Sequence, residues 1–409
     1  MLFSTKRERI LYIGYYLDTD TVKERGLPAF NVAGSNRMYR LARSLSAVKQ
    51  KVLVVSPAAS MRMRWTQPFH RSNAKRSNQI PVLFCPAFGF SFANAIAEPF
   101  MVLWSLIVLC RKYSVKTAII YNFSPSLLFA TFFLKYILGV RVFNNVEDIS
   151  RPKIKDWIKD SEARPLQEIV LSICMDSIAF ISEGFIVPTK RFLDNLPNNK
   201  PAIIVSGCMP RIEACAPPNK AQLPINILFS GKLEFEHGIH FLLNAIHQLE
   251  THFGSKINRL IEINICGSGS KSNWLRDELE KLKHARYVYH GFVSNNQYKE
   301  ILKSADVCVA LQDPKGRYKD YKTPSKVYEY LGCGKLVIAT EVGDLPNLPR
   351  EMVEICGSDV GNSLYVILKR VIENSDAIDS RKEFAAHYSL ENFSFPVVGN
   401  DIAGFIMSS

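Results

Sequence analysis

Short apolar runs alternate with amphipathic segments from the start of this chain, and that alternation restricts its fold more than any other feature. An apolar run at residues 10–15 is followed by a segment at 38–45 whose apolar residues recur at helical spacing, and then by a second apolar run at 52–55. Two strands joined by a helical crossover lie parallel in one sheet. The sequence therefore predicts an α/β fold built on parallel sheets.

The alternation resumes in the second half of the chain. Strands are predicted at 225–230, 261–266, 287–290 and 307–311, with amphipathic helices between some of them. The stretch 207–224 contains four prolines and is predicted to be an interdomain linker. At 409 residues, of which 47% are hydrophobic and 22% charged, the chain is long enough for two domains that each bury a core. We expect a first domain at 1–210 and a second at 211–380.

The segment around Pro324 combines helix signals with candidate ligands for an anion. Thr323 is placed to cap a helix, Pro324 to fill its first turn and Gly332 to end it, so that Lys326 and Glu329 share one face. A helix N-terminus beside a cation favours a diphosphate, and Glu329 could accept hydrogen bonds from sugar hydroxyls. An exposed ion pair on an ordinary αβ unit explains the same two residues about as well.

The run PSKVYEYLGCGK at 324–335, with the apolar strand after it, resembles the donor-binding segment of the family-four, GT-B-type retaining glycosyltransferases (glycosyl transferases group 1). That family carries two acidic residues eight positions apart, the second contacting the nucleotide ribose and the first lying near the transferred sugar. Glu329 fills the second position, while Tyr321 stands at the first. The resemblance implies two Rossmann-like, doubly wound domains facing a cleft, with a terminal segment at 381–409 that crosses back toward the first domain.

The same resemblance implies which loops hold the donor. In the turn after strand 225–230 the family has a basic residue after a glycine, here Lys232, and a lysine before a second glycine, where this chain has His237. The loop after 261–266 packs near the donor, and the turn at 290–293 holds the base. The expected donor-binding residues are Gly231, His237, Gly267, Phe292, Val293, Tyr321, Ser325 and Gly343. The expected catalytic residues are Lys232, Lys326, Glu329 and Glu147.

Two features of the first half are candidates for the acceptor side. Glu147 and Asp148 end the predicted strand 140–144, and ligands gather at the carboxyl ends of strands in such sheets, although a loop carboxylate that caps the next turn is an alternative. The loop 31–36, with Gly34 and Ser35, resembles the family's small-residue loop across the cleft from the donor sugar. A structural loop or helix cap needs the same small residues.

The net charge of +13 implies attraction to anions such as nucleotide diphosphates, acidic polymers, nucleic acid or an anionic membrane. The segment 58–97 has no acid, and it carries five basic residues, Arg62, Arg64, Arg71, Lys75 and Arg76, beside Trp65 and Phe69. It is predicted to be a cationic loop that contacts an anionic membrane or a lipid-linked acceptor, with a purely solvated loop as the alternative. Nucleic-acid binding is not expected, because no binding module surrounds it.

Scattered cysteines without a CxxC pair, together with a charged start and no secretory signal, predict a cytoplasmic protein. The basic segment 58–97 predicts that it docks peripherally at the inner face of the plasma membrane. The apolar segments 100–110 and 124–140 are too short or interrupted by Lys135, and are predicted to be buried or interfacial helices. No metal motif, nucleophile elbow or Walker loop occurs. The family resemblance implies metal independence, and we expect no cofactor, with the nucleotide sugar as substrate.

The family resemblance implies a retaining, metal-independent, hexosyltransferase-like enzyme. Its partners would be a nucleotide-diphosphate sugar and a saccharide or lipid-linked acceptor in cell-surface polysaccharide or glycolipid biosynthesis. Two alternatives stay open. One is a nucleotide-sugar epimerase of the same fold, and the other is a catalytically silent, glycosyltransferase-like partner subunit, because Tyr321 replaces an acid.

Overall fold

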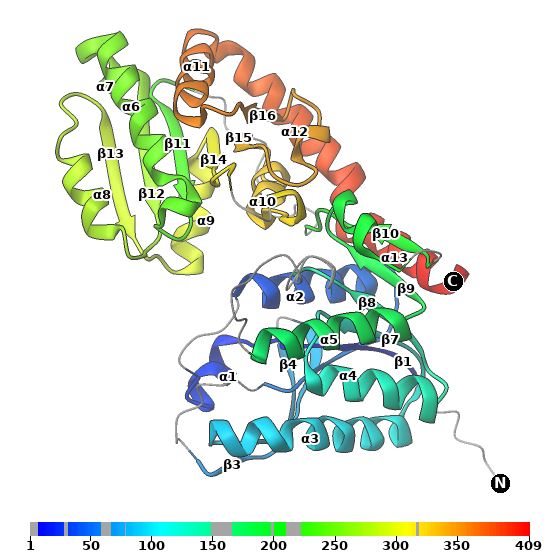
Figure 1. The fold of residues 1–409 in the computed structure, drawn as a ribbon. Helices are drawn as coiled ribbons and strands as arrows, with labels where there is room; N and C mark the ends of the chain where they lie inside the picture. Colours follow the sequence, from blue (N-terminus) through cyan, green and yellow to red (C-terminus); the bar gives the residue numbers. More distant parts are fainter. Residues whose placement is uncertain are drawn as a thin grey trace. The chain divides into compact units, whose positions relative to one another are not determined.

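The computed structural model describes residues 7–27, 32–58, 67–77, 79–148, 166–197, 200–209, 222–315 and 319–409. The chain divides into two compact units, the first made of 1–208 with 395–409 and the second of 209–394 (Figure 1). Each unit has its own sheet of mainly parallel strands, so the predicted α/β fold class is confirmed. Most of the proline-rich stretch predicted to be a linker lies outside the described residues.

The first unit is built on an eight-stranded sheet. Its strands, in spatial order, are β10 (Ala202–Ile204), β9 (Gly184–Val187), β8 (Arg141–Asn145), β7 (Ser114–Tyr121), β1 (Glu8–Ile13), β2 (Val52–Ser56), β5 (Ile80–Phe84) and β4 (Asn73–Ser77). All neighbours are parallel except β4 and β5. From β1 the chain adds strands first on one side and then on the other, so the strand order reverses between β1 and β7, where such sheets bind ligands.

Helices α2 (Val32–Ala47) and α13 (Phe395–Ser408) cover one face of this sheet. Met38 and Leu45 of α2 pack with Tyr12 and Val54 of the strands in one buried cluster. The two helices approach closely, because a Cβ added at Gly399 would lie 2.1 Å from the carbonyl oxygen of Ser44. The chain returns to the first unit at residue 395. This is later than the predicted 381, because the preceding helix α12 (Ile378–Phe393) belongs to the second unit.

The opposite face of the sheet is covered by α3 (Ser91–Lys112), by α4 (Pro125–Phe132), which continues into the π-helical turn η1 (Phe133–Ile137), and by α5 (Leu166–Ile181). Leu106, Leu127 and Ile178 point inward and are buried with Ile120 of the sheet. The helix predicted at 100–110 is only the second half of α3. Among the described helices, α3 alone has the length and hydropathy of a membrane span, which corrects the expectation that this segment is too short.

The remaining elements of the first unit are short. They are α1 (Thr19–Glu24), the strand pair β3 (Phe69–His70) and β6 (Ala87–Phe88), and the 3₁₀ helix η3 (Lys190–Asn195). The acid-free stretch 58–97, predicted to be a basic loop, is partly a hairpin, because Lys75 and Arg76 lie in β4, which pairs antiparallel with β5. Lys75 also donates to Asp18 at 3.0 Å. Its residues Arg62, Arg64 and Trp65 lie outside the described residues.

The second unit has a six-stranded, wholly parallel sheet. In spatial order its strands are β13 (Arg286–Gly291), β12 (Ile261–Cys266), β11 (Ile225–Ser230), β14 (Val307–Ala310), β15 (Leu336–Thr340) and β16 (Val353–Cys356). The strand order reverses between β11 and β14. That switch point is where an open α/β sheet leaves room for a ligand.

Helices cover both faces of the second sheet (Figure 1). One buried cluster joins the sheet to α6 (Ile239–Phe253), α7 (Ile257–Leu260), α8 (Ser272–Leu279) and α11 (Val360–Glu373). The other cluster joins it to α9 (Asn295–Ser304), α10 (Ser325–Gly332) and α12. In the described part of this unit there are also 3₁₀ turns at Phe235–His237, Gly254–Lys256, Lys319–Tyr321, Leu345–Asn347 and Ser375–Ala377.

Candidate functional site

Lys326 places a cation at the switch point of the second sheet. Strand β11 ends at Ser230, and the Lys326 Nζ donates to the Ser230 carbonyl oxygen at 2.6 Å and to its Oγ at 2.7 Å. Burial lowers the pKa of the Lys326 ammonium, and the nearby Glu329 carboxylate opposes that change. An ammonium has three donors, and Ser230 takes two of them. Lys326 is thus a desolvated cation at the carboxyl edge of the sheet.

Helix α10, which carries Lys326, starts one residue later than expected. It begins at Ser325, and Pro324 precedes it in an extended conformation as the N-cap residue, without a side-chain capping bond. The prediction that Thr323 caps the helix is therefore wrong. A residue before proline is disfavoured in helical conformation, so helical geometry begins only after Pro324.

Two loops that each begin with a glycine meet beside Lys326. A Cβ added at Gly267 would lie 1.8 Å from the Gly231 carbonyl oxygen, and one added at Gly231 would lie 4.0 Å from the Lys326 Nζ. The Gly231 amide donates to the Cys266 carbonyl at 3.0 Å, which ties the loops after β11 and β12 together. Gly267 also has φ +142°, which favours glycine. The structure thus brings three predicted residues together: Gly231 lies beside the cation, and position 267 has room only for glycine because its main chain packs against that of Gly231.

Lys232 and His237 continue the loop after Gly231. The Lys232 side chain is 66% exposed, with its Nζ 3.7 Å from Glu234 Oε1. Burial, together with the Lys322 charge, lowers the pKa of His237, so its imidazole is mostly neutral near pH 7. His237 can therefore donate or accept a hydrogen bond there, whereas a lysine would bring a charge.

Glu329, Tyr321, Ser325 and Gly343 surround α10. Glu329 is half-buried, one turn after Lys326, on a helix whose opposite side is buried. The Gly343 amide donates at 3.0 Å to the carbonyl of Lys319, in the 3₁₀ turn that contains Tyr321. Gly343 has φ +53°, so a glycine there closes this loop without strain. Ser325 is the first residue of the helix, where main-chain N–H groups lack helical partners.

The turn after β13 carries Phe292 and Val293, the two residues predicted to contact a base, and the surroundings of the two side chains differ. Val293 lines an open hollow of about 720 Å³ together with His290 and with Gln297 and Ile301 of α9. Phe292 is 86% exposed. The His290 Nε2 lies 2.8 Å from Asn264 Oδ1, which holds the ring at the edge of the hollow.

Three residues that sequence reasoning missed complete the surroundings of Lys326. Ser230 supplies both oxygens to its ammonium, and the Tyr298 ring centre lies 5.8 Å away. The hydroxyls of Tyr298 and Tyr330 are buried and have no hydrogen-bond partner within the described part of the chain. The only sequence feature that could predict the role of Ser230 is its position at the end of a strand, directly before Gly231. No local sequence feature predicts the roles of Tyr298 and Tyr330.

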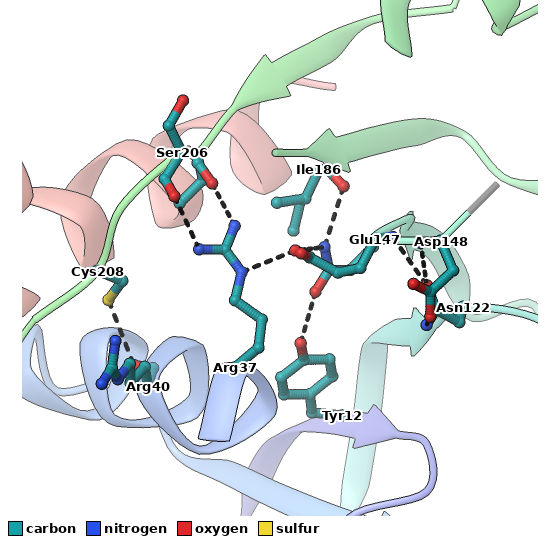
Figure 2. A network of polar contacts seen from close by, with 11 residues as sticks. Tyr12, Arg37, Arg40, Asn122, Glu147, Asp148, Ile186, Ser206 and Cys208 are labelled. Carbon is teal, nitrogen blue, oxygen red and sulfur yellow. Dashed lines mark hydrogen bonds and ion pairs between the residues drawn. The ribbon is translucent and has the colours of Figure 1, made fainter. Parts of the chain in front are cut away.

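In the first unit, Glu147 is engaged in a buried ion pair (Figure 2). Its Oε1 accepts from the Arg37 Nε at 2.7 Å and from the Asn145 Nδ2 at 3.3 Å. Arg37, on α2, also donates to the carbonyls of Val205 and Ser206. Burial raises the pKa of Glu147 against the opposing effect of the Arg37 charge. The predicted acceptor contact is thus a carboxylate that already has a cationic partner.

Asp148 is the exposed carboxylate of this loop. Its Oδ2 accepts from the Asn122 Nδ2 at 2.8 Å, and the Asn122 Oδ1 accepts from the amides of Glu147 and Asp148 (Figure 2). Asn122 follows β7 at the switch point of the first sheet. The side chain of Asn122 therefore fixes the loop after β8.

Gly34 and Ser35 do not lie in a loop ahead of a helix, as predicted. Helix α2 already begins at Val32, so both are in its first turn and both are buried. The Ser35 Oγ accepts from the Leu17 amide at 3.1 Å, which fixes the segment after β1. Residues 28–31, just before the helix, lie outside the described residues.

Comparison with known proteins identifies the second unit. The family model "Glycosyl transferases group 1" matches residues 224–362, which include Lys326 and both glycine loops. An uncharacterized glycosyltransferase of Methanocaldococcus jannaschii is 29% identical over 131 residues, 31% of this chain and 30% of the relative. A glycogen synthase of Mycobacterium tuberculosis is 31% identical over 90 residues, 21% of this chain and 20% of the relative. These matches thus span less than a third of either relative.

Solved structures extend the likeness to both units. A sucrose-phosphate synthase from Thermosynechococcus elongatus aligns with a TM-score of 0.66 and 12% identity, over 98% of this chain and 99% of that one. HepE of Anabaena, solved with UDP and glucose, aligns with a TM-score of 0.63 and 13% identity, over 98% and 99%. At such identities the likeness concerns the fold. Residues 224–362 of this chain match the glycosyl transferases group 1 family, and the two units have the GT-B fold of these solved structures.

Proposed function

We propose that this protein transfers a sugar from a nucleoside diphosphate sugar to an acceptor. The observation that carries the proposal is a desolvated Lys326 ammonium beside the Gly231 loop, against which Gly267 packs, at the switch point of the second sheet. A diphosphate needs a cation together with main-chain donors, and it is the part of the donor that leaves with negative charge. This edge of the sheet provides the cation and the close main chain.

The solved relatives support a nucleotide sugar as the donor class. HepE of Anabaena was crystallised with UDP-glucose, and a pneumococcal O-GlcNAc transferase with UDP and GlcNAc. In this chain the hollow beside Val293 and His290 would take the base, and Glu329 the ribose hydroxyls. Lys326 would hold the diphosphate, joined by the exposed Lys232 once a ligand is present.

The proposed chemistry is stabilisation of the leaving group. As the bond from the anomeric carbon to the diphosphate breaks, negative charge grows on the diphosphate oxygens, and Lys326 and Lys232 oppose that charge. The acceptor hydroxyl attacks the same face of the sugar, so that configuration is retained, without a metal and without a protein nucleophile. On the acceptor side, the exposed Asp148 is better placed than Glu147 to meet a hydroxyl, because Glu147 is paired with Arg37. We propose a saccharide or lipid-linked acceptor of cell-surface polysaccharide or glycolipid assembly.

A screen of nucleoside diphosphate sugars, each with and without lipid-linked and saccharide acceptors, tests this function. We expect release of the nucleoside diphosphate to require one donor and to rise with one acceptor class, and Lys326→Ala to abolish it. Lys281→Ala, an exposed lysine paired with Glu278 at 2.6 Å, is the matched control and keeps full activity. Conversion of the donor sugar without any acceptor would identify an epimerase. Donor binding without turnover would identify a silent subunit, and absence of donor binding contradicts the proposal.

A further inference from the structure

The outer side of the helical layer α3–α4–α5 is apolar where a water-facing layer is normally polar. On α3 the exposed residues Phe92, Ile96, Phe100, Trp104 and Val108 recur every fourth position and form one stripe, with Phe92 81% and Phe100 68% exposed. A helix on the surface of a soluble domain carries charged and polar residues on this side. The stripe is therefore unlike a scattering of single exposed hydrophobic residues.

The neighbouring helices extend the stripe into a face. The helices α3, α4 and α5 lie side by side on one side of the first sheet (Figure 1). Their further exposed apolar residues are Phe129, Phe132, Tyr136, Ile137 and Leu138 after and along α4, and Val170, Ile173 and Phe180 on α5. We call this set, with the α3 stripe, the apolar face. A contiguous apolar surface over three helices marks a site that a membrane or the apolar surface of another protein covers.

Cations border the apolar face at the amino edge of the sheet. Glu8 and Ser114 start β1 and β7 in register, the Ser114 amide donates to the Arg7 carbonyl at 3.1 Å, and α3 ends at Lys112, just before β7. Arg7, Arg111, Lys112 and Lys116 therefore gather at this edge. We call these four the basic rim. Glu8 pairs with Lys116 at 3.4 Å, which leaves the basic rim positive. Of the acids on the three helices, Glu98 points into the fold, where Ser126 and Asn94 donate to it, Asp176 is exposed, and Glu168 is in the first turn of α5.

We propose that the apolar face lies in the surface of an anionic phospholipid membrane, with the basic rim at the headgroups. Apolar helices that lie in a membrane interface combine large side chains, here with Trp104 and Tyr136, with nearby cations that attract anionic lipid. A second copy of the chain fits less well, because it presents the same cations and the same net charge of +13. This inference goes beyond the proposed function and does not depend on the donor chemistry.

The α3 helix lies on the membrane in this proposal and does not cross it. Its length of 22 residues would suffice for a crossing, and only 28% of its most apolar stretch is buried. Its inner side, however, packs Val102, Leu106 and Leu109 against the first sheet. Pulling α3 into a bilayer would expose that core and bring Glu98 into lipid, both of which are costly.

Vesicle sedimentation of the full chain tests the proposal, with phosphatidylcholine vesicles that contain or lack phosphatidylglycerol. We expect binding that needs phosphatidylglycerol and weakens with salt. The double variant Phe100→Glu, Trp104→Glu should reduce binding to background, and Arg111→Gln, Lys112→Gln should reduce the partition coefficient about tenfold or more. The control is Val366→Glu, which puts one glutamate at an exposed apolar position of α11 in the second unit and leaves binding unchanged.

A second measurement reports on the face itself. Brominated phosphatidylglycerol should quench Trp104 fluorescence on binding, and Trp104→Phe should remove that component while binding persists. The proposal is overturned if the double glutamate variant binds as the wild type does, or if no vesicle is bound. It also fails if Arg71→Gln, Arg76→Gln alone abolishes binding, or if light scattering shows a dimer that the glutamate variant splits. Unchanged affinity of the glutamate variant for UDP keeps this test separate from that of the transferase function.

Discussion

The two units each hold a desolvated cation at the carboxyl edge of a doubly wound sheet, and the partners of the two cations differ. In the first unit Arg37 faces the carboxylate of Glu147, and that charge, despite burial, leaves the pKa of Arg37 above its ordinary value. In the second unit Lys326 donates to two neutral oxygens of Ser230, and burial leaves its pKa below the ordinary value. The Glu147 carboxylate thus neutralises Arg37 inside the fold. The oxygens that accept hydrogen bonds from Lys326 are neutral and leave its charge poorly compensated.

The difference indicates which edge is built around an incoming anion. In a buried ion pair each charge depends on its partner. Removing one partner leaves the other charge buried and unpaired, which lowers the free energy of unfolding. A desolvated cation with neutral partners gains most from a ligand that brings negative charge. We therefore expect changes at Arg37 to act on stability and changes at Lys326 to act on ligand affinity.

Breaking the ion pair of the first unit should give the largest effect. Arg37→Ala leaves the Glu147 carboxylate buried without its partner, and we expect a loss of about 3 kcal/mol or more in the free energy of unfolding of this unit. Urea denaturation measures the loss. Arg191→Ala, which removes an exposed pair with Asp194, is the control and should cost about 0.5 kcal/mol or less. If Arg37→Ala unfolds like the wild type, the pair does not hold the first unit together.

Removing the cation of the second unit should change affinity more than stability. Charge-assisted contacts to phosphate contribute roughly 1.5 to 3 kcal/mol, so Lys326→Ala should weaken UDP binding by about tenfold or more, as measured by calorimetry. Its melting temperature should not fall, because the substitution also removes a desolvated charge. Lys256→Ala, at an exposed lysine of the same unit, should bind UDP normally. Unchanged affinity of Lys326→Ala would remove the lysine from the site.

The lowered pKa of Lys326 predicts how this affinity depends on pH. The ammonium binds the diphosphate only when protonated, so UDP affinity should be highest at neutral pH and fall as pH rises through the lowered pKa of Lys326, below the ordinary lysine value. By the same linkage, without ligand the second unit becomes more stable relative to its unfolded state across that window, because the folded chain releases the proton first. Lys326→Arg should flatten the affinity profile, since arginine stays charged. A wild-type profile that is already flat would contradict this account.

Glu329 should give the smallest effect of the series. Glu329→Gln keeps the shape of the side chain and loses the charge assistance to ribose hydroxyls, so UDP affinity should fall only severalfold while the melting temperature barely moves. Glu280→Gln at the end of α8 is an exposed control that should change neither quantity. A fall in melting temperature with unchanged affinity would make Glu329 a structural acid.

Much of the second unit could be predicted from sequence because its site is assembled from strand ends. Gly231 and Gly267 each follow an apolar strand, and the carboxyl ends of parallel strands meet at one edge, so local patterns were sufficient to bring them near Lys326. The role of Glu147 could not be read in this way, because its partner Arg37 is 110 positions away on a helix of ordinary pattern.

The length of α3 cannot be predicted from its own sequence for a related reason. Glu98 and Pro99 interrupt its apolar pattern, and both argue against a continuous helix when only the sequence is considered. The acid is accommodated by hydroxyls of Tyr15 and Ser126, which come from other parts of the chain. Tertiary hydrogen bonds thus overrule a local signal, and the extended helix creates the apolar face.

The return of α13 to the first unit inverts the order in which the two units can be completed during synthesis. Domains usually fold in the order in which they leave the ribosome. Here Ile402 and Ile406, which share a buried cluster with Met38 of α2, follow the entire second unit in the chain. The unit that begins first therefore holds an unfinished core throughout translation of its successor, and it closes only when that helix has emerged.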